Sequence, residues 1–491
     1  MGTLGNVEPA RRAVLSLAVL LCGVPAPAAA LSVQGQAALQ RAAALVQEGR
    51  LQEADEQAQL ALSDPATRAA ACSVLGAIRV QQDRLEEGAV LLQEATRLDP
   101  HLLGARLNLA QLYTLQGKYK RSLEVAKPAL AAFKQSPDGL LVLAADFLKT
   151  GDPASAKALL EDSRRLGDVP APWSASFAEL LVKGGLVEEG VDVLERARKA
   201  DPSSYELAFA LGGAYLVKGD PSRALEAYDA ALSGEPASVT ALRQAAAVAE
   251  RQGELERSLS YWTRAKKLAA DDPEILLGFG RVCLKMDLLE DAEPALTTAA
   301  RLKPGEPAYQ YTLAVAKVGK KQYEAAQGLL EPLVAKRPAD AQLLYALGSV
   351  LYMQGHLAEA GARLRESVRL DADQVASPYY LALVARDQGR DAEAIERLEE
   401  LLRRYPDHAS SCEALGGLMM NGQRYAEAER LLRKAVELNP KSVKANYQLG
   451  LLLARTGRRE EADKQLELAK SLREEDDATS RLQLRLLDPE G

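Results

Sequence analysis

The stretch of sequence from residue 205 to residue 236 decides the fold, and it reads YELAFALGGAYLVKGDPSRALEAYDAALSGEP. Apolar residues in each half of this stretch are spaced three and four apart, which is typical of an amphipathic helix. Small residues at Gly212 and Ala224 would let two such helices approach closely. Gly219 marks the break between the two helices, and Pro236 ends the second one. The stretch therefore predicts a helix, a short turn, a second helix and a proline turn.

The same pattern recurs every 34 residues along the chain. The position of Gly212 is occupied by Ala or Gly in all thirteen copies, namely Ala42, Gly76, Ala110, Ala144, Ala178, Gly212, Ala246, Gly280, Ala314, Gly348, Ala382, Gly416 and Gly450. No insertion or deletion is needed from residue 35 to residue 476. A fixed period of this length indicates a repeat protein in which each period is one supersecondary unit. We therefore expect an all-α solenoid whose core is continuous between neighbouring units.

Glycine and proline mark the turns of this predicted array. A glycine just past a helix end is suited to the left-handed conformation that ends many helices. It occurs at the same repeat position in nine copies, as Gly49, Gly117, Gly151, Gly185, Gly219, Gly253, Gly355, Gly389 and Gly457. Proline closes seven copies, as Pro100, Pro202, Pro236, Pro304, Pro338, Pro406 and Pro440.

These residues resemble the tetratricopeptide repeat, TPR. Residues 205–236 carry the family's pattern of small, aromatic and turn-forming residues as Leu211, Gly212, Tyr215, Gly219, Ala224, Tyr228, Ala231 and Pro236. The resemblance implies a right-handed superhelix of about thirteen helix-turn-helix units over residues 35–476. The first copy departs from the pattern with Arg41, and the fourth and fifth lack some signature residues, which leaves the boundaries of these copies open.

Composition limits the classes of function. The net charge of −7 argues against non-specific binding of nucleic acid, which needs a basic surface. Aromatic residues make up 5% of the chain, and Ala-rich helix packing explains this better than an aromatic-lined cofactor site. We expect no cofactor and no nucleic-acid partner.

The first thirty residues do not fit the repeat. Arg11 and Arg12 precede an apolar run from Ala13 to Val24, and a Pro/Ala-rich segment then ends at Ala30. This arrangement is typical of a secretory signal peptide, and the apolar run is short for a membrane span. We expect residues 1–30 to be removed and the mature chain, without a transmembrane segment, to be periplasmic or envelope-associated. A twin-arginine signal, a lipid anchor at Cys22 and an ordinary apolar tail are the alternatives.

After such a cleavage three cysteines remain, Cys72, Cys283 and Cys412. All three fall on predicted first helices of distant repeats, so we expect buried, free thiols rather than disulfides. Residues 477–491 follow the last repeat, and we interpret them as a cap or tail.

Residue patterns for catalysis or metal binding are missing from the sequence. His101, His356 and His408 each stand alone in or beside a predicted turn, and we expect them to be solvated. Phosphate-binding, dinucleotide-binding and nucleophile-elbow motifs do not occur. The sequence therefore predicts neither a metal site nor an enzyme.

The resemblance to TPR arrays implies that the first helix of each repeat lines an inner groove through repeat positions 2, 5, 9 and 12. Tyrosine offers a broad apolar face with a hydroxyl group, and arginine suits carboxylates. We therefore consider as partner-binding residues Tyr311, Tyr345, Tyr352, Tyr379, Tyr447, Arg281 and Arg386. Two alternatives remain open: the rings pack against neighbouring helices, or each arginine forms an ion pair within the chain, with Glu250, Asp387 or Glu413.

The sequence thus predicts a non-enzymatic interaction scaffold that binds an extended peptide or protein partner along a concave groove. The resemblance implies a role in bacterial envelope assembly or secretion. A periplasmic TPR arm that binds or guides an exopolysaccharide is the alternative, since tyrosine faces also suit sugar rings.

Overall fold

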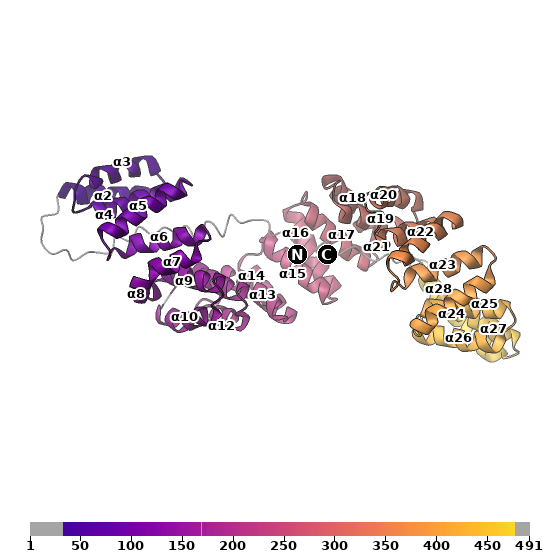
Figure 1. The fold of residues 1–491 in the computed structure, drawn as a ribbon. Helices are drawn as coiled ribbons and strands as arrows, with labels where there is room; N and C mark the ends of the chain where they lie inside the picture. The colour runs from indigo at the N-terminus through magenta and orange to yellow at the C-terminus, as the bar shows by residue number, and fades with distance from the viewer. Residues whose placement is uncertain (1–32, 168, 477–491) are drawn as a thin grey trace. The chain divides into compact units, whose positions relative to one another are not determined.

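The structure is a computed structural model that describes residues 33–167 and 169–476; the predicted signal peptide and the tail from residue 477 onward lie outside these residues. All regular structure in the described part is helical, with no strand, which confirms the predicted all-α class (Figure 1). Along the sequence, the helices of the described part fall into thirteen successive pairs, each made of a first helix, here called the A helix, and a second helix, the B helix. Each pair corresponds to one 34-residue repeat.

The chain divides into two compact units, and the division falls between Gln252 and Gly253. The described part of the first unit contains α2 (Val33–Gln47), α3 (Leu51–Leu62), α4 (Arg68–Gln81), α5 (Leu85–Leu98), α6 (Leu103–Leu115), α7 (Tyr119–Ala126), η1 (Lys127–Ala129), α8 (Leu130–Lys134), α9 (Pro137–Lys149), α10 (Pro153–Arg165), α11 (Ala171–Lys183), α12 (Val187–Ala200), α13 (Tyr205–Lys218), α14 (Pro221–Gly234) and α15 (Val239–Arg251).

The described part of the second unit contains α16 (Leu255–Leu268), α17 (Pro273–Lys285), α18 (Leu289–Leu302), α19 (Pro307–Gly319), α20 (Tyr323–Lys336), α21 (Ala341–Met353), α22 (Leu357–Leu370), α23 (Ala376–Asp387), α24 (Asp391–Arg404), α25 (Ala409–Asn421), α26 (Tyr425–Leu438), α27 (Val443–Arg455) and α28 (Arg459–Asp476). Within each unit, consecutive helices pack on one another, and A helices of neighbouring repeats also touch, as α2 and α4 or α21 and α23 do.

Small residues at the repeat position of Gly212 bring the two helices of a pair together. A Cβ atom added to Gly76 of α4 would lie 2.7 Å from Leu92 Cγ of α5, and one added to Gly280 of α17 would lie 2.5 Å from Leu296 Cγ of α18. Both distances are too short for a real contact. At these glycine copies the facing B helix therefore leaves no room for a side chain without a shift of its leucine.

The turn between the A and B helices has one conformation throughout. Its central residue has a positive φ in every repeat, and the nine predicted glycines are among them, which confirms the prediction for those turns. Non-glycine residues adopt the same left-handed conformation in the remaining four turns, as Asp83, Asp287, Lys321 and Gln423. The helix pairing thus dictates the turn geometry even where the residue does not favour it.

The third and fourth repeats depart from this regular pattern. The B helix of the third repeat is interrupted, because α7 ends at Ala126 and a 3-10 turn that contains Pro128 precedes α8. Phe133 of α8 is fully buried, and the absence of a side chain at Gly139 of α9 leaves room for the Phe133 backbone.

A carboxyl group is buried in the fourth repeat. Asp146 of α9 has no exposed surface, although the other twelve copies carry an apolar residue at this position. The Thr114 hydroxyl donates a hydrogen bond of 2.8 Å to Asp146 Oδ1, and Asp146 Oδ2 has no hydrogen-bond partner. Burial raises the pKa of Asp146 to about 7 despite the neighbouring hydroxyl groups of Ser122 and Thr114.

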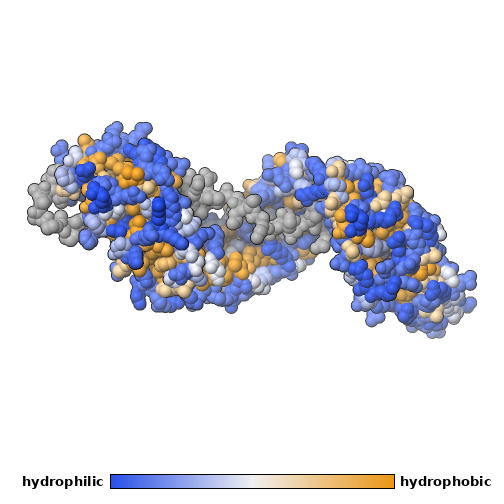
Figure 2. Space-filling view, viewed as in Figure 1, coloured by the Kyte–Doolittle hydropathy of each residue, from blue (hydrophilic) through white to orange (hydrophobic). Residues whose placement is uncertain are grey.

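The cores consist of apolar side chains between the helix layers, and hydrophilic residues cover much of the visible surface of each unit (Figure 2). Cys72, Cys283 and Cys412 are buried and free, as predicted. Among the described helices, none is both long enough and apolar enough to cross a lipid bilayer.

Candidate partner-binding site

The A helices of the last four repeats carry most of the predicted partner-binding residues. These helices are α21, α23, α25 and α27 of the second unit. Position 5 of each repeat holds Tyr345, Tyr379, Glu413 and Tyr447 in turn. The exposed and half-buried side chains of these four helices are called the A-helix surface below.

Two of the predicted tyrosines lie in the core. Tyr311 of α19 has no exposed surface, and Tyr345 of α21 is 4% exposed. The Tyr311 hydroxyl accepts a hydrogen bond of 3.0 Å from Gln342 Nε2, and burial raises the pKa of Tyr345. A partner can reach neither ring in this structure, so the alternative that these rings pack internally is the correct one for them.

Tyr352 and Arg386 meet where α21 faces α23. The Tyr352 hydroxyl donates a 2.6 Å hydrogen bond to Asp387 Oδ2 and lies 3.2 Å from Arg386 Nη2, which donates to it. Arg386 Nε also donates to Asp387 Oδ1 over 2.7 Å. The side chains of Arg386 and Asp387 are 29% and 34% exposed. The ion pair with Asp387 is one of the alternatives that the sequence left open for Arg386.

This environment shifts the pKa of Tyr352 and the pKa of Asp387 in opposite directions. Burial, assisted by the hydrogen bond to Asp387, raises the pKa of Tyr352 to about 12. Burial acts against ionisation of Asp387, but the hydrogen bonds from Arg386 and Tyr352 outweigh it and lower the pKa of this carboxyl. The cluster therefore combines an ion pair with a neutral phenol that hydrogen-bonds to both of its members.

Tyr379 is half-buried at the centre of a group of rings. Its ring contacts Tyr380 edge-on at 5.5 Å and His408 edge-on at 5.4 Å, both measured between centroids. His408 Nδ1 lies 2.6 Å from Ser411 Oγ, and burial lowers the pKa of His408. The prediction of a solvated turn histidine is therefore wrong for His408, because the preceding repeat places Tyr379 against its ring.

The surface continues onto α25 and α27 through a second ion pair. Lys444 Nζ lies 2.8 Å from Glu413 Oε1, and the Ser442 hydroxyl donates a 2.8 Å hydrogen bond to Glu413 Oε2. Tyr447 is 51% exposed, the most open of the predicted tyrosines. The A-helix surface thus offers rings and paired charges from four consecutive repeats.

Arg281 lies apart from this cluster in the repeat order. It is half-buried on α17, two repeats before α21. Sequence analysis named Asp387 as a possible ion-pair partner but missed its hydrogen bond with Tyr352, and it missed the ring contact between Tyr379 and His408. The signal that could have found them is the repeat phase, because Asp387 at the end of α23 and His408 directly before α25 each lie about one repeat after the tyrosine that they contact.

Comparison with known proteins identifies the family. Family models described as tetratricopeptide repeat match residues 176–239, 209–273 and 311–375, residues 379–408, and residues 418–486. These matches together span more than half of the chain, and the chain belongs to the tetratricopeptide repeat family. Arrays of this family typically mediate protein–protein interactions and are generally non-catalytic.

Individual relatives are distant. The chain is 21% identical over 290 residues to BBSome complex member BBS4 of Bos taurus, a match that covers 59% of this chain and 56% of that protein, so the chain spans little more than half the length of this curated relative. A tetratricopeptide repeat protein from Parabacteroides merdae is similar with 18% identity and a TM-score of 0.41, over 51% of this chain and 98% of that one. The APC/C hetero-tetramer Cut9–Hcn1 is similar with 11% identity and a TM-score of 0.44, over 90% and 94% of the two chains.

Proposed function

We propose that the protein is a non-enzymatic scaffold that binds an extended peptide or a protein partner along the A-helix surface. The observation that carries the proposal is the continuity of this surface: Tyr352 contacts the Arg386–Asp387 pair, Tyr379 contacts His408, and Lys444 pairs with Glu413. These contacts hold the side chains in place before a partner arrives, which lowers the entropic cost of binding.

The chemistry of this surface suits a peptide with both apolar and polar side chains. The exposed face of Tyr447 can pack against an apolar residue, and tyrosine provides contact area at low conformational cost. The half-exposed Arg386 and the exposed Lys444 each retain donors that their carboxylate partners do not fill.

Selection of peptides from a random library against the full chain tests this function. Peptides that use the A-helix surface should bind the variant Arg386→Ala/Lys444→Ala/Tyr447→Ala about tenfold or more weakly, because each anchor in such a site contributes about 2 kcal/mol. The matched control is Val90→Ala/Val217→Ala, which changes two exposed apolar residues of the first unit, 65% and 61% exposed.

Equal binding of the selected peptides to both variants would place the partner elsewhere on the molecule. Binding of oligosaccharides to the purified chain, lost in the same triple variant, would instead favour the alternative of a polysaccharide-guiding arm.

We further propose that the protein is exported and acts in envelope assembly or secretion. The support is the order of Arg11–Arg12, the apolar run from Ala13 to Val24 and the Ala-rich segment that ends at Ala30. Mass spectrometry of protein purified from its native host should find Leu31 or Ala29 at the amino terminus. An intact Met1 or Gly2 in a cytoplasmic fraction would contradict export.

A further inference from the structure

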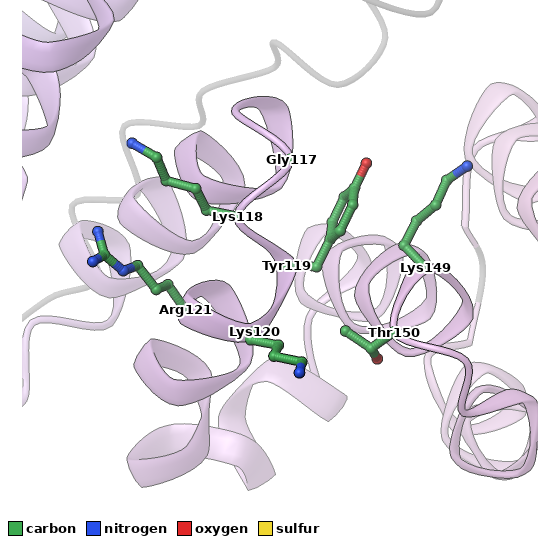
Figure 3. Close-up of a pocket in the computed structure, with 7 residues that line it drawn as sticks. All are labelled: Gly117, Lys118, Tyr119, Lys120, Arg121, Lys149 and Thr150. Carbon is green, nitrogen blue, oxygen red and sulfur yellow. The ribbon is translucent and has the colours of Figure 1, made fainter.

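A hollow of about 470 Å³ opens in the first unit, away from any A-helix position considered above (Figure 3). The turn after α6 and the start of α7 form one side, and the end of α9 forms the other. We call it the basic hollow, and its lining residues are Gly117, Lys118, Tyr119, Lys120, Arg121, Lys149 and Thr150. Four of these seven side chains are cationic, in a chain whose net charge is −7.

Most of this positive charge is not neutralised within the protein. Lys118 Nζ lies 3.6 Å from Glu86 Oε1, a loose ion pair. Lys120, Arg121 and Lys149 are exposed, and no carboxylate of the described residues lies within ion-pair distance of them. The exposed positive charges of the basic hollow can therefore attract an anionic partner over a long range.

The start of α7 differs in charge from the start of every other B helix that the structure describes. Carboxylates favour a helix amino terminus, and the other twelve B helices carry one in the first turn or immediately before it. These include Glu53, Glu86, Asp152, Glu188, Asp220, Glu256, Glu290, Glu324, Glu359, Asp391, Glu427 and Glu460. In α7 the corresponding residues are Lys118 to Arg121, with no acidic residue in the first turn. Among the described B helices, α7 is therefore the one whose amino terminus has no carboxylate of its own nearby in sequence.

The cationic groups are spread out rather than focused on a single point. In the view of Figure 3, Lys118 and Arg121 extend to one side and Lys149 lies on the other, with the Tyr119 ring and Lys120 between them. A compact phosphate group would be gripped by cations that converge on it. Separate cations along two neighbouring repeats suit several carboxylates carried on one chain.

We propose that the basic hollow binds an acidic segment of a partner protein, whose Asp or Glu carboxylates pair with Lys120, Arg121 and Lys149. The Tyr119 ring would pack against the aliphatic part of this segment. The basic hollow lies in the first unit and shares no residue with the A-helix surface of the second. It is a second contact region for a scaffold. Its binding can be tested separately, because the test does not depend on the A-helix surface.

Binding of a fluorescently labelled oligoglutamate peptide to the full chain, followed by anisotropy, tests the proposal. The variant Lys120→Glu/Arg121→Glu/Lys149→Glu should bind this peptide about tenfold or more weakly, because like charges in contact oppose association. The matched control Arg41→Glu/Arg68→Glu/Lys199→Glu makes the same change in net charge at exposed positions of the same unit. It should bind within about twofold of the unchanged chain, since distant surface charges are screened.

A second variant, Lys120→Gln/Arg121→Gln/Lys149→Gln, removes the charges without adding new ones and should weaken binding in the same direction. Circular dichroism of all variants should match that of the unchanged chain, because the three residues are exposed. Equal losses in the hollow and control variants would overturn the proposal, since they would show only an effect of net charge. Hollow-dependent binding of inorganic phosphate or anionic lipid vesicles, without binding of oligoglutamate, would also overturn it.

Discussion

At the scale of single residues, the buried carboxyl of Asp146 should make stability depend on pH. Its pKa is raised from 3.8 to about 7 in the folded protein, so the folded state favours the protonated form. The contribution to stability is therefore complete below the unfolded pKa and is lost as the pH rises from about 4 to about 7. Asp146→Asn cannot ionise, and this rise in the pKa of Asp146 implies that the variant should be more stable than the unchanged chain by about 4 kcal/mol at pH 8.

Urea denaturation at pH 8 and at low pH measures this difference, which should shrink towards zero below about pH 4. Asp271→Asn, at an exposed position, is the control and should change neither value. A constant difference between Asp146→Asn and the unchanged chain at all pH values would show that ionisation of Asp146 is not the cause.

Two tyrosines of the same predicted set should differ sharply in their effect on stability. Tyr311→Ala empties a fully buried site and should cost about 3 kcal/mol or more, whereas Tyr447→Ala, at a 51% exposed site, should cost about 0.5 kcal/mol or less. Thermal unfolding followed by circular dichroism distinguishes them. Similar melting temperatures for the two variants would contradict the burial of Tyr311.

The same pair shows what the sequence could not reveal about the site. Repeat phase placed Tyr311, Tyr345, Tyr379 and Tyr447 at one position of the A helix, but phase does not determine how far a ring is covered by its neighbours. Tyr345 packs with Tyr380 at 6.0 Å between ring centroids, and residues of the next repeat decide this burial. Tyr447 has no comparable ring contact in the described part of its surroundings and stays open.

At the scale of helices, the close approach of an A helix to the B helix of the preceding repeat predicts opposite effects for two glycines of the second unit. A Cβ atom on Gly278 of α17 would overlap the Trp262 ring of α16, whereas one on Gly328 of α20 would meet no atom within 4 Å. Gly278→Ala should therefore destabilise by about 1–3 kcal/mol, and Gly328→Ala should stabilise by about 0.5–1 kcal/mol. Melting temperatures that shift in the same direction for both variants would contradict this packing.

Helix boundaries show where prediction from sequence ends. The 34-residue period correctly predicted a helix-turn-helix unit in each repeat, because helix pairing constrains the spacing of small residues. It did not reveal the break between α7 and α8 at Pro128, and proline alone is a poor guide, since Pro294 and Pro332 lie inside the continuous helices α18 and α20. Whether a proline interrupts a helix depends on how the neighbouring helices hold its ends.

At the scale of the whole molecule, a repeat array consists of repeats that contact mainly their neighbours. A destabilising substitution should therefore lower stability only in the repeats near it. Tyr311→Ala should speed hydrogen exchange in α19 to α23, where its core cluster lies, and leave the exchange of α2 to α9 in the other unit unchanged. Faster exchange throughout both units would contradict an array of locally stabilised repeats.

The central claim is that a partner lies along the A helices of the last four repeats. Hydrogen exchange of the full chain, measured by mass spectrometry with and without a library-selected peptide bound, tests it most directly. The account predicts slower exchange in α21, α23, α25 and α27, with little change in α22, α24 and α26. Protection confined to those B helices or to residues 33–252 would contradict the claim.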